Sequence, residues 1–450
     1  MKKKMGIVLL LCIILVGAGI SYYNSQSKAA MGQNVGEEEV TQKICSLEGN
    51  VVRVEIKNTQ INVLERQGQQ WINSAYKDLK YDWSSVHQWL SDLRSIESKE
   101  VIHKVEDESI YGIDEQSVMI TLYDEMNNSQ TFKVGKSVQD KAVLYVATDR
   151  MQGVYGVAMS AQETLLKDPN SFVIAQLNAP SVEEIQEIAF DIKGEKNISL
   201  KKVYDLGHDK WYLVDYYKVS YGVQAEVIEN ILGILDGMKA ESFAGIITDI
   251  QDYGLSKPQM IITFNNEWSL SLSKMEGDRV YGRVNQEPYV YAINKEVLEQ
   301  LANLKPFSII NKEVLEMTLQ GNKEIILENP QGKYTLSLKD KNEGQIATEP
   351  IGYLNDKELT KEQISELMAT LNSSIWLEAA LQNPEIEQKE ERKAEITITC
   401  KMTNGQEDKI ELIPYDINYY ILRTNGEIEF AVNKDKATKL FSTLHRMTKK

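Results

Sequence analysis

Two aromatic residues stand ten positions apart near the end of each third of this chain. The pairs are Tyr145 with Tyr155, Tyr281 with Tyr291, and Tyr420 with Phe430. Their second members lie in similar runs, VYGVAMS at 154–160, VYAINKE at 290–296 and EFAVNKD at 429–435. The runs are 136 and 139 residues apart, close to the length of one domain. This period predicts three tandem structural units, and the alternative is a chance likeness between three domains of similar composition.

Other landmarks follow in the same order in each copy. Each copy opens with an alternating strand, at Val52-Val54-Ile56, Ile188-Phe190-Ile192 and Leu315-Met317-Leu319. A strand centred on an aromatic residue follows, at Trp71, Trp211 and Tyr334. Apolar residues three and four positions apart then predict an amphipathic helix at Val86, Leu90 and Leu93, at Val223, Val227, Ile231 and Leu235, and at Ile364, Leu367, Leu371 and Ile375. Thr360 and Gln363 predict a capping box at the third of these helices, and Asn294 and Asn433 predict N-caps of later, shorter helices.

A Tyr-Gly pair follows the helix in two of the copies. Tyr111-Gly112 and Tyr253-Gly254 each precede an alternating strand that begins seven residues after the tyrosine. The third copy has the strand, AEITITC at 394–400, but Glu387 and Gln388 stand in place of the pair. The glycines predict a turn with positive φ, which a side chain would disfavour.

These patterns predict an α+β fold of three tandem units, each a mainly antiparallel sheet with one main helix packed on it. The predicted boundaries are a signal-anchor or transmembrane segment at 1–24, a polar acidic tether at 25–47, and repeats at 48–178, 179–309 and 310–450. The third repeat is the divergent one.

The second copy carries a resemblance to a known family most clearly. IQEIAFDIKG at 185–194, the strand at Trp211, YGLSKPQMIITF at 253–264 with Pro258, and VYAINKEVLEQL at 290–301 resemble, in order, the bacterial family called domain of unknown function 4340. The resemblance covers about 48–310 well and the last third weakly. It implies an exported, membrane-anchored protein encoded beside components of gliding-motility-type ABC transporters. The family pattern contains no catalytic residue, so it implies none here.

The N-terminus predicts the attachment to a membrane. Lys2, Lys3 and Lys4 precede an apolar run from Gly6 to Ile20, and this charge bias predicts a cytoplasmic N-terminus with the body outside. The run also has the length of a cleaved signal peptide, and that alternative stays open. The expected location is therefore the cell membrane, crossed once.

Composition and motifs argue against several functions. A net charge of −16 disfavours nucleic acid as a partner, since nucleic acid attracts basic surfaces. The four histidines lack metal-ligand spacing, and no phosphate-binding or nucleophile motif occurs. Neither a cofactor, a metal, a catalytic residue nor a small-molecule substrate is expected. Cys45 and Cys400 lie far apart in sequence, and either a disulfide between them or a buried, free Cys400 fits the pattern.

The function expected from these observations is that of a non-catalytic accessory or scaffold protein outside the cytoplasm. The partner that the resemblance implies is an ABC-type permease or one of its auxiliary subunits. Binding of cell-envelope or wall polymer is the alternative, and exposed tyrosines from the groups at 212–221 and 415–420 would serve it. Core packing of these tyrosines, as of Trp71 and Trp211, is the simpler interpretation.

Overall fold

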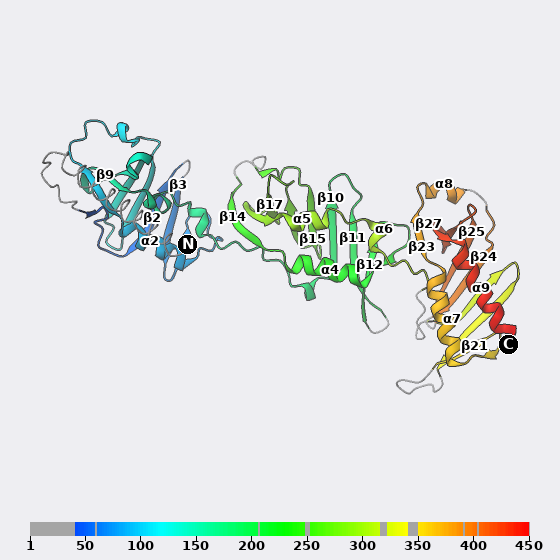
Figure 1. Ribbon diagram of the computed structural model, residues 1–450. Coiled ribbons are helices and arrows are strands. Elements are labelled where there is room, and N and C mark those ends of the chain that lie inside the picture. Colours follow the sequence, from blue (N-terminus) through cyan, green and yellow to red (C-terminus); the bar gives the residue numbers. More distant parts are fainter. Residues whose placement is uncertain are drawn as a thin grey trace, which may run out of the picture. The chain divides into compact units, whose positions relative to one another are not determined.

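Antiparallel β-sheet is the main secondary structure of the computed structural model of the chain (Figure 1). The structure describes residues 41–58, 61–205, 208–247, 253–315, 322–340, 350–389, 392–402 and 405–449. The chain divides into an N-terminal unit, Met1–Ile174, and a C-terminal unit, Ala175–Lys450. The predicted membrane segment at 1–24 and most of the predicted tether lie outside the described residues. Within the described part, no helix has the length and apolar character needed to cross a membrane.

The N-terminal unit contains one nine-stranded sheet and the C-terminal unit contains two. The first sheet comprises β1 (Gln42–Lys43), β2 (Val51–Lys57), β3 (Ile61–Gln67), β4 (Gln70–Asn73), β5 (Glu97–Ile102), β6 (Val118–Asp124), β7 (Ser129–Val138), β8 (Val143–Thr148) and β9 (Met151–Ala158). The second comprises β10 (Glu187–Ile192), β11 (Ile198–Asp205), β12 (His208–Val214), β13 (Tyr221–Gly222), β14 (Ala240–Ile246), β15 (Met260–Phe264), β16 (Trp268–Leu272), β17 (Arg279–Val284) and β18 (Tyr289–Asn294). The third comprises β19 (Asn322–Asn329), β20 (Gly332–Asp340), β21 (Pro350–Leu354), β22 (Lys357–Glu358), β23 (Leu377–Ala380), β24 (Ile396–Met402), β25 (Glu407–Pro414), β26 (Tyr419–Thr424) and β27 (Glu427–Asn433).

The second and third sheets have the same strand order. Numbered one to nine along each repeat, their strands lie in the order four, three, two, one, six, seven, eight, nine, five. The first sheet follows the same order if β2 is taken as its first strand, except that among the described residues it has no fourth strand and that β1 pairs outside the fifth strand, β5. The α+β class with antiparallel sheets, and the internal repeat, are therefore confirmed.

The register between the ninth and fifth strands is also repeated. Tyr155 pairs with Val101, Tyr291 with Phe243, and Phe430 with Ala380. In each sheet an irregularity of one residue follows at the same place, between Ser98 and Glu100, Ala240 and Ser242, and Leu377 and Ala379. Tyr155, Tyr291 and Phe430 therefore occupy equivalent points of their sheets.

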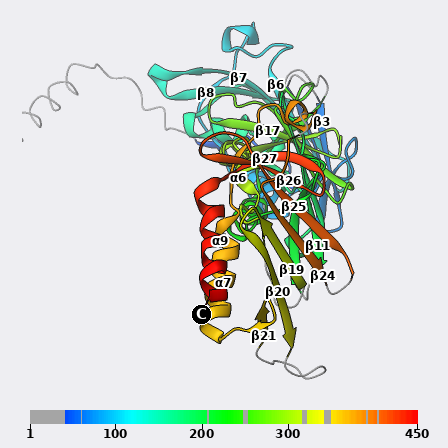
Figure 2. The ribbon, with the colours of Figure 1, turned by 90° about the vertical axis from the view of Figure 1, so that its right-hand side faces the viewer.

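One main helix per repeat covers the sheet, and a second helix follows the ninth strand. The predicted short helix is found in the first two repeats, whereas in the third repeat the second helix is longer than the main one. The main helices are α2 (Trp83–Arg94), α4 (Ala225–Asp236) and α7 (Lys361–Ser374), and the later ones are α3 (Gln162–Leu165), α5 (Lys295–Leu301) and α9 (Lys434–Lys449). Figures 1 and 2 show α7 and α9 side by side against the third sheet. Val86, Leu90 and Leu93 of α2 are buried, as an amphipathic helix requires. The capping box of Thr360 and Gln363 begins α7, and the Asn294 side chain caps α5.

One predicted landmark of the third repeat lies elsewhere in the structure, and another lies mostly outside the described residues. The opening strand of the third sheet is β19, where Ile325 and Leu327 are buried, whereas 316–321 of the predicted strand lie outside the described residues. Tyr334 lies on the second strand of its sheet, β20, whereas Trp71 and Trp211 lie on third strands. The prediction was wrong here because an alternating apolar pattern identifies a strand and not its position in a sheet.

The link between the second and third sheets is paired with both of them. It begins with α6 (Pro306–Ile309). Ile310 then forms a bridge with Val223, beside the edge of the second sheet, and the Asn311 amide donates to the Gly222 carbonyl (2.6 Å). Further on, Glu313 forms a bridge with Trp376 at the edge of the third sheet. Backbone hydrogen bonds therefore tie one short segment to two sheets.

Candidate functional site

The two Tyr-Gly pairs form equivalent turns on different sheets. Gly112 has φ 73° and Gly254 has φ 68°, in the left-handed region where glycine is preferred. Tyr111 packs edge to face on Tyr145 with ring centroids 4.9 Å apart, and Tyr253 packs in the same way on Tyr281 at 5.3 Å. The residues that follow the glycines, Ile113 and Leu255, are buried. These contacts give the motif a packing role: it holds the chain between the fifth and sixth strands against the eighth.

The third repeat replaces this turn with a helix. Glu387 and Gln388 lie in α8 (Pro384–Lys389). Glu387 pairs with Arg392 at 3.1 Å, and the Gln388 amide donates to the Gly426 carbonyl at 2.8 Å. In the second repeat, Pro258 is half-buried just before β15. In the third repeat both side chains are therefore engaged in local contacts.

The tryptophans of the two third strands belong to the core. Trp71 in β4 is 2% exposed and Trp211 in β12 is 7% exposed. Trp71 stacks against Trp83 of α2 with ring centroids 6.5 Å apart. The Lys202 ammonium lies 5.5 Å from the Trp211 ring centroid on the neighbouring strand. Both indoles therefore serve packing.

The site with the most unusual chemistry lies within the C-terminal unit, where a carboxylate of the third sheet enters the second. Glu429 in β27 is 8% exposed. Its Oε1 accepts the backbone N–H of Lys218 (2.5 Å), and its Oε2 accepts the N–H of Val219 and the hydroxyl of Tyr221, both at 3.3 Å. We call these four residues, together with the aromatic residues Tyr217, Phe307 and Phe430 around them, the joint. A buried carboxylate requires such donors, because it has lost the hydrogen bonds of water.

A β-bulge aims Glu429 at these donors. Leu422 of β26 pairs with Phe430 and Arg423 pairs with Ile428, so Glu429 is an extra residue in its strand. A bulge of this kind redirects a side chain and bends the strand locally. The adjacent Phe430 therefore reaches the same neighbours as Glu429.

Aromatic rings surround the carboxylate. The Phe430 ring packs on Tyr217 (4.8 Å between centroids), Tyr221 (5.0 Å) and Phe307 (5.6 Å). Tyr217 and Tyr221 come from the second sheet's edge and Phe307 from α6. Burial raises the pKa of both tyrosines, with the Glu429 charge adding to the effect. The tyrosine group at 212–221 thus contributes to a junction between repeats.

Burial also shifts the pKa values of Glu429 in the joint and of Lys312 in the link beside it. It raises the pKa of Glu429, and this effect outweighs the opposing hydrogen bonds from Lys218, Val219 and Tyr221. Burial lowers the pKa of Lys312, in the link after α6, to about 8. The Lys312 ammonium lies 3.1 Å from the Phe307 ring centroid, and within the described residues it has no hydrogen-bond acceptor.

Sequence reasoning missed Glu429, although one signal for it was present. The runs VYGVAMS and VYAINKE begin with Val154 and Val290, which are fully buried, whereas EFAVNKD begins with glutamate. A charged residue at a position that is apolar in the other copies indicates a polar partner close in space. The sequence could not identify that partner, since it is 211 residues away along the chain.

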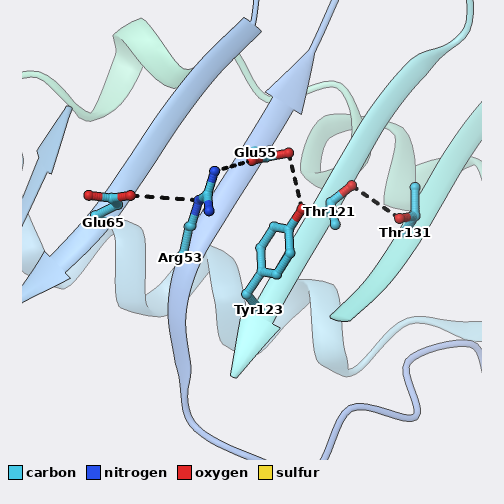
Figure 3. A network of polar contacts seen from close by, with 6 residues as sticks. All are labelled: Arg53, Glu55, Glu65, Thr121, Tyr123 and Thr131. Carbon is cyan, nitrogen blue, oxygen red and sulfur yellow. Dashed lines mark hydrogen bonds and ion pairs between the residues drawn. The ribbon is translucent and has the colours of Figure 1, made fainter. Parts of the chain in front are cut away.

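The outer face of the first sheet carries a second group of polar contacts, shown in Figure 3. Arg53 pairs with Glu55 and, at 3.7 Å, with Glu65, and the Tyr123 hydroxyl donates to Glu55 (3.2 Å). The hydroxyls of Thr121 and Thr131 are 3.1 Å apart on adjacent strands. Arg53 and Glu55 alternate with the buried residues of β2, so they lie on the face away from the core. The other four residues lie directly opposite one another or these two on the neighbouring strands, and so share that face. Exposed ion pairs of this kind contribute little stability.

Similar pairs mark the first strands of the other sheets. Lys201 pairs with Glu187 at 2.6 Å in the second sheet, and Lys401 pairs with Glu324 at 2.7 Å in the third. No group of three or more metal-ligating side chains occurs in the described ranges. Cys45 and Cys400 are both free, and Cys400 is buried.

The comparisons with known proteins agree with the repeat. The model of the family Domain of unknown function (DUF4340) matches twice, over residues 71–249 and 211–394. The two matches begin at Trp71 and Trp211, the equivalent tryptophans of two third strands. No curated protein and no solved structure matches the chain.

Proposed function

We propose that this chain, which belongs to the DUF4340 family, is a non-catalytic accessory or scaffold protein. It would be anchored in the cell membrane by residues 1–24, with its body outside the cytoplasm, and would partner an ABC-type permease or an auxiliary subunit of one. The positive charges at Lys2, Lys3 and Lys4 support this orientation. The resemblance to the family supports the class of partner.

The joint is the observation that supports a scaffold most directly. Its buried carboxylate and aromatic side chains connect one repeat to the next. Glu429 accepts three hydrogen bonds from the neighbouring repeat, and the link at 310–314 pairs with two sheets. Two like sheets joined in this way present repeated polar faces to a partner. A fixed spacing between such faces is a property that a scaffold requires.

A membrane anchor would make weak contacts effective. Confinement beside a membrane partner raises the effective concentration of the body, so that individually weak contacts suffice for binding. Removal of residues 1–24 should therefore leave the body folded and abolish, or greatly weaken, its co-purification with membrane partners. Circular dichroism of the shortened chain checks folding. An unrelated single-pass anchor in place of 1–24 should restore co-purification.

Two results would contradict the proposal. If the shortened chain binds its partners as well as the full chain does, the anchor has no role in binding. If the purified body turns over an envelope or nucleotide substrate with no partner present, the non-catalytic assignment fails.

The second candidate function is binding of cell-envelope or wall polymer. The polar outer face of the first sheet favours it, because Arg53, Tyr123, Thr121 and Thr131 offer a row of hydrogen-bonding groups on one surface. Sedimentation of the body with isolated wall polymer tests this function. Binding that Tyr123→Ala and Arg53→Ala remove would favour it over the scaffold.

A further inference from the structure

The fifth strand forms one edge of each repeat's fold, and in two of the sheets an incoming chain segment covers it. In the first sheet, Gln42 pairs with Ser98 and Lys43 with Glu97. The Ile44 amide donates to the Ile96 carbonyl at 3.1 Å. The molecule therefore closes this edge with a short extended segment that precedes the repeat.

The third sheet closes its fifth strand in the same way. The Leu377 amide donates to the Lys312 carbonyl at 2.9 Å, and the Val314 amide donates to the Ile375 carbonyl at 3.1 Å. Glu313 forms a bridge with Trp376 between these bonds. Lys312, Glu313 and Val314 thus correspond to Gln42, Lys43 and Ile44.

The second sheet differs at this edge. Its incoming segment reaches the corresponding place, because Trp268 Nε1 donates to the Leu177 carbonyl (3.2 Å) just as Gln130 Nε2 donates to the Ile44 carbonyl (2.8 Å). Trp268 and Gln130 are equivalent residues of the seventh strands. Yet β14 ends its sheet, and in the described part of the chain no backbone hydrogen bond joins Ala175 or Gln176 to Lys239 or Ala240.

A pocket of about 490 Å³ lies where the pairing is missing. The incoming segment 175–182 forms one side, and the end of α4 with the start of β14, 235–240, forms the other. The buried side chains of Leu235, Met238 and Phe264 line it. Two exposed residues of opposite charge, Asp236 and Lys239, also line it. An unpaired strand edge beside a pocket with both apolar and polar lining is a template for an added strand, because its backbone groups can pair while side chains enter the pocket.

We propose that this pocket, which we call the edge slot, binds an extended peptide segment of a partner protein as an added strand on β14. The inference rests on the proposed function, since it needs a protein partner. The two intramolecular segments show what fits such an edge: a polar residue, a charged residue and a β-branched apolar residue, as in Gln42-Lys43-Ile44 and Lys312-Glu313-Val314.

The residue at the paired register position, Lys239, specifies the occupant further. In the first sheet Lys43 lies opposite Glu97, a pair of opposite charges. The register places Lys239 of the second sheet at the position of Glu97. Because opposite charges across strands attract, the occupant carries an acidic residue followed by a branched apolar one. The sequence Lys-Glu-Val meets this requirement.

A labelled peptide with the sequence of residues 310–315, Ile-Asn-Lys-Glu-Val-Leu, tests the inference by fluorescence anisotropy with the full chain. Saturable binding is expected. Lys239→Glu should weaken it about two- to fivefold, the effect of one cross-strand charge pair. The same variant should favour a peptide with lysine in place of its glutamate. Lys274→Glu, an exposed charge in the same unit, is the matched control and should change neither affinity.

A reversible lock provides the second measurement. Ala175→Cys with Ala240→Cys places a cysteine pair where Gln42 and Ser98 pair in the first sheet. The oxidised double variant should lose peptide binding and the reduced one should regain it, while saturating peptide should slow oxidation. Each single variant is a control for disulfide formation with the native Cys45 or Cys400.

Three results would overturn the inference. The first is that the peptide does not bind the full chain saturably. The second is that the locked and reduced forms bind the peptide equally and that Lys239→Glu does not change its affinity. The third is that saturating peptide leaves the rate and extent of disulfide formation unchanged. The last result means that the incoming segment itself covers the edge. If membrane partners still co-purify with the locked chain, they do not bind through the edge slot, and the proposed function is unaffected.

Discussion

A single residue, Glu429, shows how strongly the surroundings of a side chain determine its role. In the other two repeats the equivalent position is a buried valine, Val154 or Val290. Here the glutamate is also buried, but it accepts two backbone N–H groups and a hydroxyl. Replacing it by an apolar residue would leave these donors without an acceptor, and unsatisfied buried groups cost more than the net value of a hydrogen bond.

Glu429→Ala should therefore lower the free energy of unfolding of the C-terminal unit by about 1–3 kcal/mol. Glu429→Gln keeps the shape of the protonated acid, so it should cost less than Glu429→Ala at pH 7. Chemical denaturation monitored by fluorescence measures both. Equal losses in the two variants would mean that the acceptor oxygens have no part in the joint.

The pKa of Glu429 makes the same joint sensitive to pH. Because burial raises this pKa, the folded unit binds more protons than the unfolded chain between the two pKa values. The contribution of this group to stability is complete below its unfolded pKa of about 4.3 and is lost as pH rises through the folded pKa. Glu429→Gln should remove this part of the pH dependence, whereas Glu267→Gln, at an exposed site, should retain it. Parallel pH profiles for wild type and Glu429→Gln would contradict the assignment.

Two glycines in the same motif have different constraints. A Cβ at Gly112 would lie 2.8 Å from the Lys136 backbone nitrogen, whereas at Gly254 the nearest atom would be 3.6 Å away. Both alanine variants incur the left-handed backbone cost of about 1–2 kcal/mol, and Gly112→Ala adds a clash with β7. Its loss of unfolding free energy should therefore exceed that of Gly254→Ala. Equal losses would show that β7 moves to accommodate the methyl group.

At the scale of elements, each sheet depends on one face packed by a helix and its own buried aromatic residues. The third strand β12 carries Trp211, which is 7% exposed. Trp211→Ala should destabilise the C-terminal unit by about 3–5 kcal/mol, the usual cost of truncating a buried aromatic side chain. Trp211→Phe, which keeps most of the apolar area, is the control and should cost much less. A loss below about 1 kcal/mol for alanine would contradict a core role, since it is far below the usual cost of truncating a buried aromatic side chain.

At the scale of the whole molecule, the division at Ile174 and Ala175 predicts two unfolding transitions, because separate units need not unfold cooperatively. Trp71→Ala should shift only the transition of the N-terminal unit, and Trp211→Ala only the other. Differential scanning calorimetry of the full chain measures both shifts. A single transition that both variants move equally would show that the two units unfold together.

Sequence by itself determined the repeat, the α+β class and most of the strands and helices. These features depend on local periodicity: alternation along β10 or β24, and spacings of three and four along α2 and α7, follow from which face each side chain presents. The family resemblance, built on motifs such as Tyr253-Gly254 and the strand at Trp211, is confirmed by the family model. The predicted anchor at 1–24 and the partner in the membrane stay predictions.

Only the tertiary structure decided the joint, the edge slot and the place of Tyr334. Tyr334 has the pattern of any aromatic strand residue, and its position in the sheet depends on pairing with β19. Glu429 meets Lys218 across 211 residues, a contact that no local pattern encodes. The open edge of β14 likewise depends on whether two distant segments pair. Local sequence specifies which face of an element is apolar, but contacts between distant elements determine what each face or edge meets.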